Sequence, residues 1–211
     1  MGKIMLCDDT PELVDTIGKE LRNLNFNITN IVYSGQDCID AIKNGAAPDL
    51  LILDISMPKM PGYEVVKQLK KSNPEIKMLI FSAYNDINVV KAMIRLGVNG
   101  FAEKGIKPIE LAEIIRKVLN GETYFPPEHL FSAEAIETMK QEKIPWAEQL
   151  TLKEIQAAQL LANDETRKTA ASIMQISPSA FNKKIERIFK KTGQRAVIGA
   201  LNLLRKVGMI Q

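Results

Sequence analysis

The chain has 211 residues, of which 45% are hydrophobic and 25% are charged, a composition typical of globular protein with room for one large domain or two modest ones. No apolar run reaches the roughly 18 residues that a membrane helix needs, and no hydrophobic leader precedes Asp8 and Asp9. The two cysteines, Cys7 and Cys38, lack the spacing of metal ligands, and His129 is the only histidine that could bind a metal with them, which argues against a zinc site. We therefore expect reduced thiols in a cytoplasmic protein that does not enter a membrane.

Charge is unevenly distributed along the chain. Residues 1–120 carry 15 Lys+Arg and 15 Asp+Glu, residues 121–144 carry 2 and 5, and residues 145–211 carry 11 and 5. This distribution predicts a neutral domain over residues 1–120, an acidic linker over 121–147 and a basic domain over 148–211. A basic domain favours a polyanionic partner, although a charge excess of this size also suits an ordinary solvated surface.

The first 120 residues alternate short apolar runs with segments of helical periodicity. The apolar runs predict strands over residues 3–7, 28–33, 50–53, 76–81 and 99–102. The periodic segments predict helices that begin at the N-cap Thr10 and over residues 36–43, 63–70, 88–96 and 108–119. Five strand–helix units of this length predict an α/β fold, a doubly wound five-stranded parallel sheet with helices on both faces.

Polar residues end four of these strands. Asp8 and Asp9 follow the first strand, Asp54 the third, Ser82 the fourth and Lys104 the fifth. The carboxyl ends of parallel strands meet at one edge of a sheet, so we expect these side chains to converge. Two like charges about 4 Å apart repel by on the order of 4 kcal/mol at an effective dielectric near 20, so three carboxylates require cations nearby. We predict Mg²⁺ and Lys104 as those cations, in a pocket that suits a phosphoryl group on Asp54.

Residues 121–147 read as a linker. Gly121, Pro126 and Pro127 interrupt regular structure, and residues 132–142 can form a short acidic helix. The single histidine, His129, argues that the chain is neither a kinase nor a phosphotransfer module. Phosphate would therefore come from another protein or from a small donor.

The last third predicts a small helical domain. Thr151 and Glu154 form a capping-box pattern, Thr166 starts a second helix, and Ser177–Pro178 open a third. Two short helices joined by a tight turn, the second with a basic outer face, are typical of a helix-turn-helix that enters a DNA major groove, whereas a basic solvated helix is the alternative. The candidate DNA contacts on the third helix are Ser179, Asn182, Lys183, Lys184, Glu186, Arg187 and Lys190.

Residues 1–120 resemble the receiver domain of two-component response regulators, a flavodoxin-like fold. The resemblance is carried by the acidic pair at residues 8–9, the D-x-x-M-P-x-M-x-G pattern over residues 54–62, the Ser-Ala at residues 82–83, and an aromatic residue three positions before Lys104. It implies that a sensor histidine kinase phosphorylates Asp54.

The same resemblance implies roles for the other pocket residues. Asp8, Asp9 and Asp54 would hold Mg²⁺ together with the backbone carbonyl of Ser56. Three further residues would respond to the phosphoryl group: Ser82 would bond its oxygens, Lys104 would pair with it, and Phe101 would be an aromatic switch that turns inward when Ser82 moves. Ser82 as a helix cap and Phe101 as ordinary core are the alternatives.

Residues 150–200 are similar to the LuxR-type helix-turn-helix that ends response regulators of the NarL/FixJ class. The similarity includes Leu150–Thr151, Glu154 and the Lys-x-Gly at residues 191–193. The chain departs from the family at Arg167–Ala171, where N-K-E-I-A is usual, and at Ala180–Asn182, where T-V-K is usual. A lysine that usually contacts DNA is thus replaced by Asn182, for which Lys183 and Lys184 could compensate.

Together these patterns predict a transcription regulator, not an enzyme, that is switched by phosphorylation, binds double-stranded DNA and forms a homodimer when phosphorylated. A receiver whose helical domain binds protein instead of DNA is one alternative. An aspartyl-phosphate hydrolase is another, but it needs a second acid two residues after the nucleophile, where this chain has Ser56.

Overall fold

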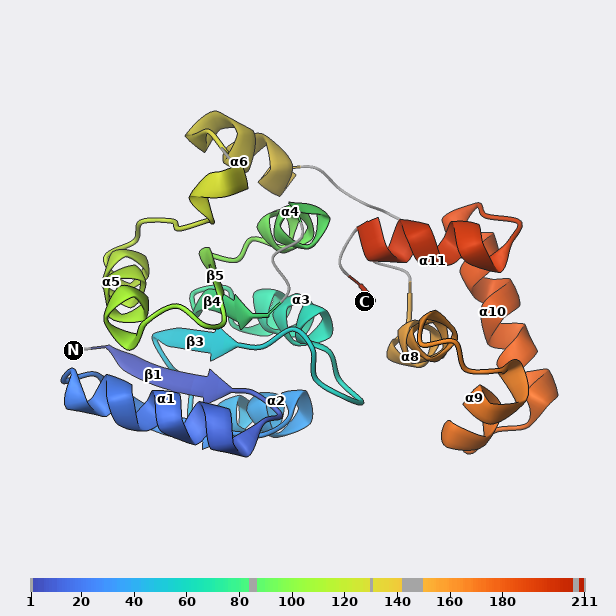
Figure 1. Ribbon diagram of the computed structural model, residues 1–211, viewed down its shortest axis with the longest axis horizontal. Coiled ribbons are helices and arrows are strands. Elements are labelled where there is room, and N and C mark those ends of the chain that lie inside the picture. The colour runs from blue at the N-terminus through green and yellow to red at the C-terminus, as the bar shows by residue number, and fades with distance from the viewer. Residues whose placement is uncertain (1, 84–86, 130, 142–149, 207–208, 211) are drawn as a thin grey trace. The chain divides into compact units, whose positions relative to one another are not determined.

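The computed structural model describes all residues except 1, 84–86, 130, 142–149, 207–208 and 211 (Figure 1). The chain divides into two compact units, Met1–Gln141 and Glu142–Gln211. None of the helices in the described ranges combines the length and the apolar character that a bilayer crossing requires.

The first unit alternates strands and helices in the order that the sequence predicts. Its elements are β1 (Lys3–Cys7), α1 (Pro11–Asn23), β2 (Asn27–Val32), α2 (Gly35–Lys43), β3 (Leu50–Leu53), α3 (Gly62–Ser72), β4 (Lys77–Ser82), α4 (Ile87–Arg95), β5 (Gly100–Glu103), α5 (Pro108–Leu119), the 3-10 turn η1 (Pro127–His129) and α6 (Ala133–Gln141). Thr10 occupies the N-cap position of α1, but its side chain makes no capping hydrogen bond. Each predicted strand and helix is present, with bounds shifted by a few residues.

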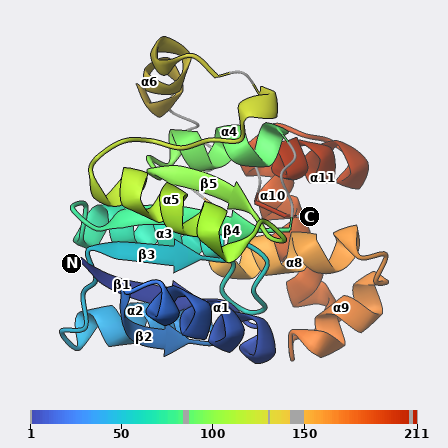
Figure 2. The same ribbon diagram turned by 60° about the vertical axis from the view of Figure 1, so that its left-hand side comes forward.

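The strands form one parallel sheet in the order β2-β1-β3-β4-β5. Helices α1 and α5 pack on one face, and α2, α3 and α4 cover the other (Figures 1 and 2). All four residues of β3 are buried because the strand lies at the centre with helices on both sides. The predicted doubly wound α/β fold is therefore confirmed.

The segment after α5 is attached to the sheet. The Phe101 N–H donates to Tyr124 O at 2.8 Å, and the Tyr124 N–H donates to Asn99 O at 3.2 Å, so Tyr124 pairs with the outer edge of β5. Helix α6 then packs against α4, with Met139 buried. Residues 121–141 therefore belong to the first unit by contact, whereas the sequence placed them in a linker because Gly121 and two prolines interrupt the helical pattern. The three-part domain division stays a prediction.

The second unit contains α8 (Leu152–Ala162), α9 (Arg167–Ile173), α10 (Pro178–Thr192) and α11 (Val197–Lys206). The side chains of Thr151, Thr166 and Ser177 each cap the helix that follows them, as their positions predict. Helix α10 contacts α8, α9 and α11, and it buries an apolar stripe that includes Phe181 and Ile185. Helices α9 and α10 with their short turn form the predicted helix-turn-helix.

The turn between α9 and α10 contains a backbone conformation that favours glycine. Gln175 has a φ of 53°, in the left-handed region. We expect Gln175→Gly to stabilise the second unit by about 1 kcal/mol, since a side chain in this region costs about that much. Urea denaturation would measure the gain. The control Gln156→Gly, within α8, should instead destabilise by about 1 kcal/mol. A loss of stability in Gln175→Gly would contradict the strain argument.

Candidate functional site

The carboxyl edge of the sheet carries the residues that the sequence singled out. Cys7 pairs with Leu53, so Asp8 and Asp54 follow neighbouring strands at the same level, and both are buried. Lys104 directly follows β5, and its N–H donates to Ser82 O at 2.8 Å, which ties the ends of β4 and β5 together. The predicted convergence at this edge is therefore present.

Hydrogen bonds and ion pairs orient the carboxylates. The Lys104 ammonium lies 2.7 Å from Asp8 Oδ2 and 3.3 Å from Asp54 Oδ1. Asp8 Oδ1 accepts a hydrogen bond from the Thr10 N–H at 2.9 Å, and Asp54 Oδ2 accepts one from the Ser56 N–H at 3.1 Å. Sequence patterns did not predict that the Asp8 side chain, and not that of Thr10, would satisfy the backbone at the start of α1.

The electrostatics of the pocket are unbalanced. Burial raises the pKa of Asp54 above its usual value, the Lys104 charge lowers it, and the neighbouring Asp8 raises it further, so the net shift is upward. Among the described residues, Lys104 is the one cation that forms ion pairs with the two buried carboxylates, Asp8 and Asp54, and Asp9 lies close by. The carboxylates of the pocket therefore outnumber the positive charge that Lys104 supplies.

The donor set fits a hard divalent cation. One carboxylate oxygen from each of Asp8, Asp9 and Asp54 lies within 4.8 Å of the other two. Asp54 Oδ1 is buried and accepts no hydrogen bond from the described residues, although the Lys104 ammonium is near. Carboxylate oxygens are the ligands that Mg²⁺ and Ca²⁺ prefer, and an orphaned buried oxygen is stabilised by such an ion.

The loop after β3 approaches the Asp54 backbone closely. A Cβ atom on Gly62 would lie 2.4 Å from Asp54 O and 2.8 Å from the Ile55 Cα, so only glycine fits at that position. The Gly62 N–H also donates to Ile55 O at 2.9 Å. The loop therefore holds the backbone of Asp54 in place.

Ser82 and Phe101 lie where the sequence predicts, but their environments differ from that of the carboxylates. Ser82 ends β4 and is fully buried. Phe101 is 0% exposed within β5, so its side chain is already buried in this conformation and does not start from an exposed position. The switch role of these two residues stays a prediction.

The predicted DNA contacts lie on or beside the outer face of α10. Asn182 and Lys184 are half-buried at the flanks of the helix, and the other predicted contacts are exposed: Ser179, Lys183, Glu186, Arg187 and Lys190. Asn182 Oδ1 accepts a hydrogen bond from Arg167 Nη1 at 3.0 Å. The sequence identified Arg167 only as a departure from the family pattern. That α9 would place it against α10 was not predictable from local signals.

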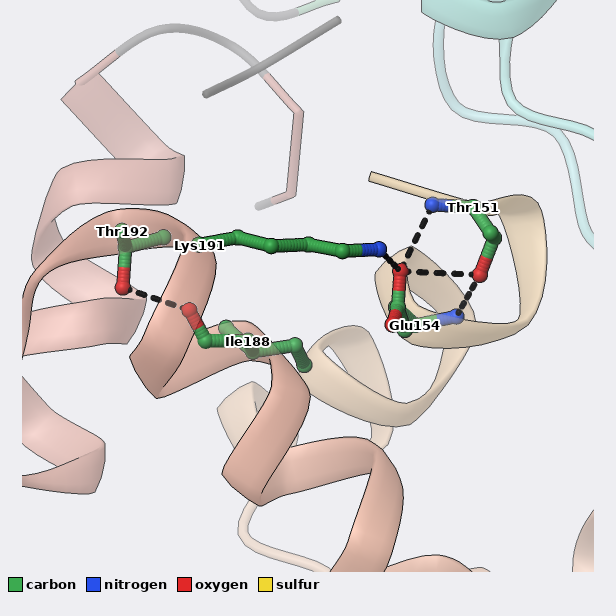
Figure 3. A network of polar contacts seen from close by, with 5 residues as sticks. All are labelled: Thr151, Glu154, Ile188, Lys191 and Thr192. Atoms are coloured by element: carbon green, nitrogen blue, oxygen red, sulfur yellow. Dashed lines mark hydrogen bonds and ion pairs between the residues drawn. The ribbon is translucent and has the colours of Figure 1, made fainter. Parts of the chain in front are cut away.

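A polar network holds α10 against α8 (Figure 3). The Lys191 ammonium lies 2.6 Å from Glu154 Oε2, and the Thr151 N–H donates to the same oxygen at 2.8 Å. Burial alone would raise the pKa of Glu154, but the bonds from Lys191 and Thr151 outweigh it, and the net shift is downward. Glu154 of the predicted capping box thus also binds α10, the helix that carries the candidate DNA contacts.

The fold and the pocket define a class of protein, in which a receiver-type α/β unit with an acidic pocket precedes a helix-turn-helix unit. Residues 4–116 match the response regulator receiver domain family. The chain is 30% identical to the response regulator protein VraR of Staphylococcus saprophyticus over 164 residues, 77% of each chain. It is 24% identical over 211 residues to the response regulator GacA of Pseudomonas aeruginosa, covering 100% of this chain and 98% of that one. The chain belongs to the response regulator family, in its NarL/FixJ class.

A solved structure supports the fold of the whole chain. RcsB from Salmonella enterica serovar Typhimurium, bound to promoter rprA, matches with a TM-score of 0.58 and 20% sequence identity, covering 97% of this chain and 99% of that chain. The match extends through the helical unit and agrees with the two-unit architecture.

Proposed function

We propose that this protein is a two-component response regulator in which a sensor histidine kinase phosphorylates Asp54 and the helical unit binds double-stranded DNA to regulate transcription. One observation carries the proposal: Asp54 is buried at the end of the central strand, its Oδ1 accepts no hydrogen bond from the described residues, and Lys104 and two further aspartates lie beside it. Such a carboxylate can act as a nucleophile, and the negative charge of the acyl phosphate that it forms would be balanced by the nearby lysine.

The chemistry is a phosphoryl transfer between two protein groups. An Asp54 oxygen attacks the phosphorus of a phosphohistidine, an O–P bond forms, the N–P bond breaks, and the imidazole takes up a proton. Asp8, Asp9, Asp54 and the Ser56 carbonyl would hold Mg²⁺, which when bound supplies positive charge to the phosphoryl oxygens. Lys104 then exchanges its contact with the carboxylates for one with the phosphoryl group, and the Ser82 hydroxyl donates to it.

The product would be a phosphoprotein and not a free phosphate. Ser56 lies two residues after Asp54, where a hydrolase needs an acid to protonate its leaving group. We therefore propose no turnover of phosphate esters beyond slow phosphorylation by small donors and slow hydrolysis of the acyl phosphate on the protein itself.

The helical unit would deliver the output. Its outer α10 face is basic and exposed, and the relatives of the chain include proteins named transcriptional regulators. Phosphorylation would favour a homodimer, because two linked helix-turn-helix units that engage two half-sites gain avidity that a single unit lacks. RcsB dimers have been solved on DNA, which agrees with this arrangement.

A gel shift tests the switch. At a fixed salt concentration, an acyl-phosphate donor with Mg²⁺ should tighten binding to a duplex obtained by selection from random oligonucleotides, and sedimentation should show a shift toward dimer. Equal affinity and equal mass with and without the donor would overturn the proposed switch.

Removing two basic residues of α10 should weaken the DNA contact. Lys183 and Lys190 are both exposed on the outer face. If each neutralises one phosphate, the double change Lys183→Gln/Lys190→Gln reduces the slope of log K against log salt by about 1.8 and weakens binding in 0.1 M salt by about 60-fold. Fluorescence anisotropy over a salt series would measure both quantities. An unchanged slope would contradict docking through this face.

A helical unit that binds protein is the second candidate, because Asn182 replaces the lysine of the family pattern. Retention on bulk DNA separates the two functions. Salt-dependent retention of the full chain supports DNA binding, and elution with the unbound fraction at low salt supports a protein partner.

A further inference from the structure

One hydrogen bond joins the two helices of the helix-turn-helix at its exposed end. Arg167, the first residue of α9, donates from Nη1 to Asn182 Oδ1 on α10 at 3.0 Å, across 15 residues of sequence. Arg167 is exposed and Asn182 is half-buried beside the outer face of α10. The bond therefore holds a cationic side chain of one helix against the flank of the other.

The partner of the guanidinium is a neutral amide. No ion pair between Arg167 and a carboxylate is present among the described residues, and Glu186, one turn further along α10, does not approach it within ion-pair distance. An amide fixes the direction of a guanidinium without neutralising its charge. One of the five guanidinium N–H groups is used in this bond, and the remaining donors have the planar arrangement that matches two phosphate oxygens.

These two positions are also where the sequence departs from the LuxR-type pattern. Asparagine is usual at the position of Arg167, and lysine is usual at that of Asn182. In this chain the cation, Arg167, is on α9 and the amide, Asn182, is on α10, which is the reverse of the family pattern. The hydrogen bond between them holds the cation beside α10. The positive charge at this corner of the unit is thereby kept.

We propose that Arg167 binds a DNA phosphate and that Asn182 is its positioning residue. This inference rests on the proposed DNA-binding function. The first helix of a helix-turn-helix crosses the DNA backbone while the second lies in the major groove, so a cation on α9 at the border with α10 faces the phosphates at the groove edge. Such a contact adds affinity and register without reading the sequence.

Arg167→Gln tests the phosphate contact in the full-length protein. If one phosphate contact is lost, affinity for a duplex of a few helical turns falls about eightfold in 0.1 M salt, and the salt slope falls by about 0.9. The matched control is Lys168→Gln, which removes the same charge from the neighbouring exposed residue of α9. The proposal requires that only Arg167→Gln lowers the slope by this amount. Equal slopes in the two variants would overturn it.

Two changes at Asn182 test the positioning role. Asn182→Ala keeps the charge of Arg167 but frees its side chain, so binding should weaken about two- to tenfold with an unchanged salt slope, the ordinary loss when a long side chain must be ordered on binding. In the double variant Arg167→Gln/Asn182→Ala the loss should not exceed that of Arg167→Gln. Arg167→Gln/Asn182→Lys should recover the slope, because a cation returns to the same corner. Additive losses would overturn the positioning role.

Sequence dependence distinguishes a phosphate from a base. Arg167→Gln should weaken a selected duplex and a mixed-sequence duplex by the same factor, and a loss confined to the selected duplex would overturn the phosphate assignment in favour of a base contact. Failure of the proposed function is distinguishable, since the wild type itself would then show no salt-dependent binding to either duplex.

Discussion

Replacing Asp54 by asparagine is expected to abolish phosphate incorporation and, at the same time, to raise the thermal stability of the first unit. The amide cannot form the acyl phosphate, so labelling by an acyl-phosphate donor with Mg²⁺ falls to background. Stability rises because a buried charge with incomplete compensation is removed, a change worth about 1–3 kcal/mol. Mass spectrometry of the intact chain and thermal denaturation without Mg²⁺ would measure the two effects.

The stability gain should depend on pH in a defined direction. The pKa of Asp54 is raised in the folded protein, so the folded state binds this proton more tightly than the unfolded chain does. The wild type is therefore less stable than Asp54→Asn by the full amount above the raised pKa of Asp54. This difference in stability disappears below the pKa of the unfolded chain, near 3.9. Asp54→Asn should accordingly exceed the wild type in stability at neutral pH and match it in strong acid.

A matched carboxylate supplies the control for Asp54. Glu75 is exposed before β4, and Glu75→Gln should incorporate phosphate like the wild type and keep its stability. Mg²⁺ should stabilise the wild type and this control, by about 2.7 kcal/mol at 100 times the dissociation constant, and should stabilise Asp54→Asn less. Wild-type labelling of Asp54→Asn would place the acceptor elsewhere and contradict the site.

Replacing Lys191 by methionine should strongly destabilise the second unit. Glu154 is 2% exposed, and loss of Lys191 leaves its carboxylate buried with only the Thr151 bonds. Breaking a buried ion pair costs about 3–5 kcal/mol, and about 2–4 is expected here because Lys191 is 23% exposed. A unit of this size has a total stability of about 3–10 kcal/mol. Hydrogen exchange of α8 and α10 amides would measure the loss and locate it.

Two further variants give this prediction its controls. Lys190→Met removes the neighbouring exposed charge and should leave hydrogen exchange unchanged. Adding Glu154→Gln to Lys191→Met should recover part of the stability, since a neutral amide is less costly to bury than a carboxylate and can still accept from Thr151. Equal exchange rates in Lys191→Met and wild type would show that the pair contributes nothing.

The Glu154 network also predicts how the second unit responds to acid. Its pKa is lowered on folding, so the stability that it contributes is fully present above the unfolded value near 4.3 and is lost as the pH falls through the lower folded pKa. The second unit should therefore lose stability below about pH 4, and Glu154→Gln should reduce this pH dependence.

Local patterns in the sequence determined the elements and the class of site. The alternation of apolar runs with helical periodicity predicted the sheet, because burial on both faces requires such runs and parallel pairing requires the crossovers. The strand ends predicted which carboxylates meet. The caps at Thr151, Thr166 and Ser177 predicted where three helices of the second unit begin, since a capping bond spans three residues and is visible in sequence.

Only the tertiary structure decided the contacts between elements. Lys104 lies nearer to Asp8 than to Asp54, and Tyr124, in the segment expected to be a linker, pairs with β5. Lys191 binds Glu154, which is 37 residues away in the sequence. The bond between Arg167 and Asn182 likewise depends on how α9 packs against α10. These pairs are set by helix packing and by where the chain returns to the sheet, which no short-range pattern records. Local sequence thus predicted which chemical groups meet in the pocket, whereas the residues that orient these groups and balance their charges are brought there by tertiary packing.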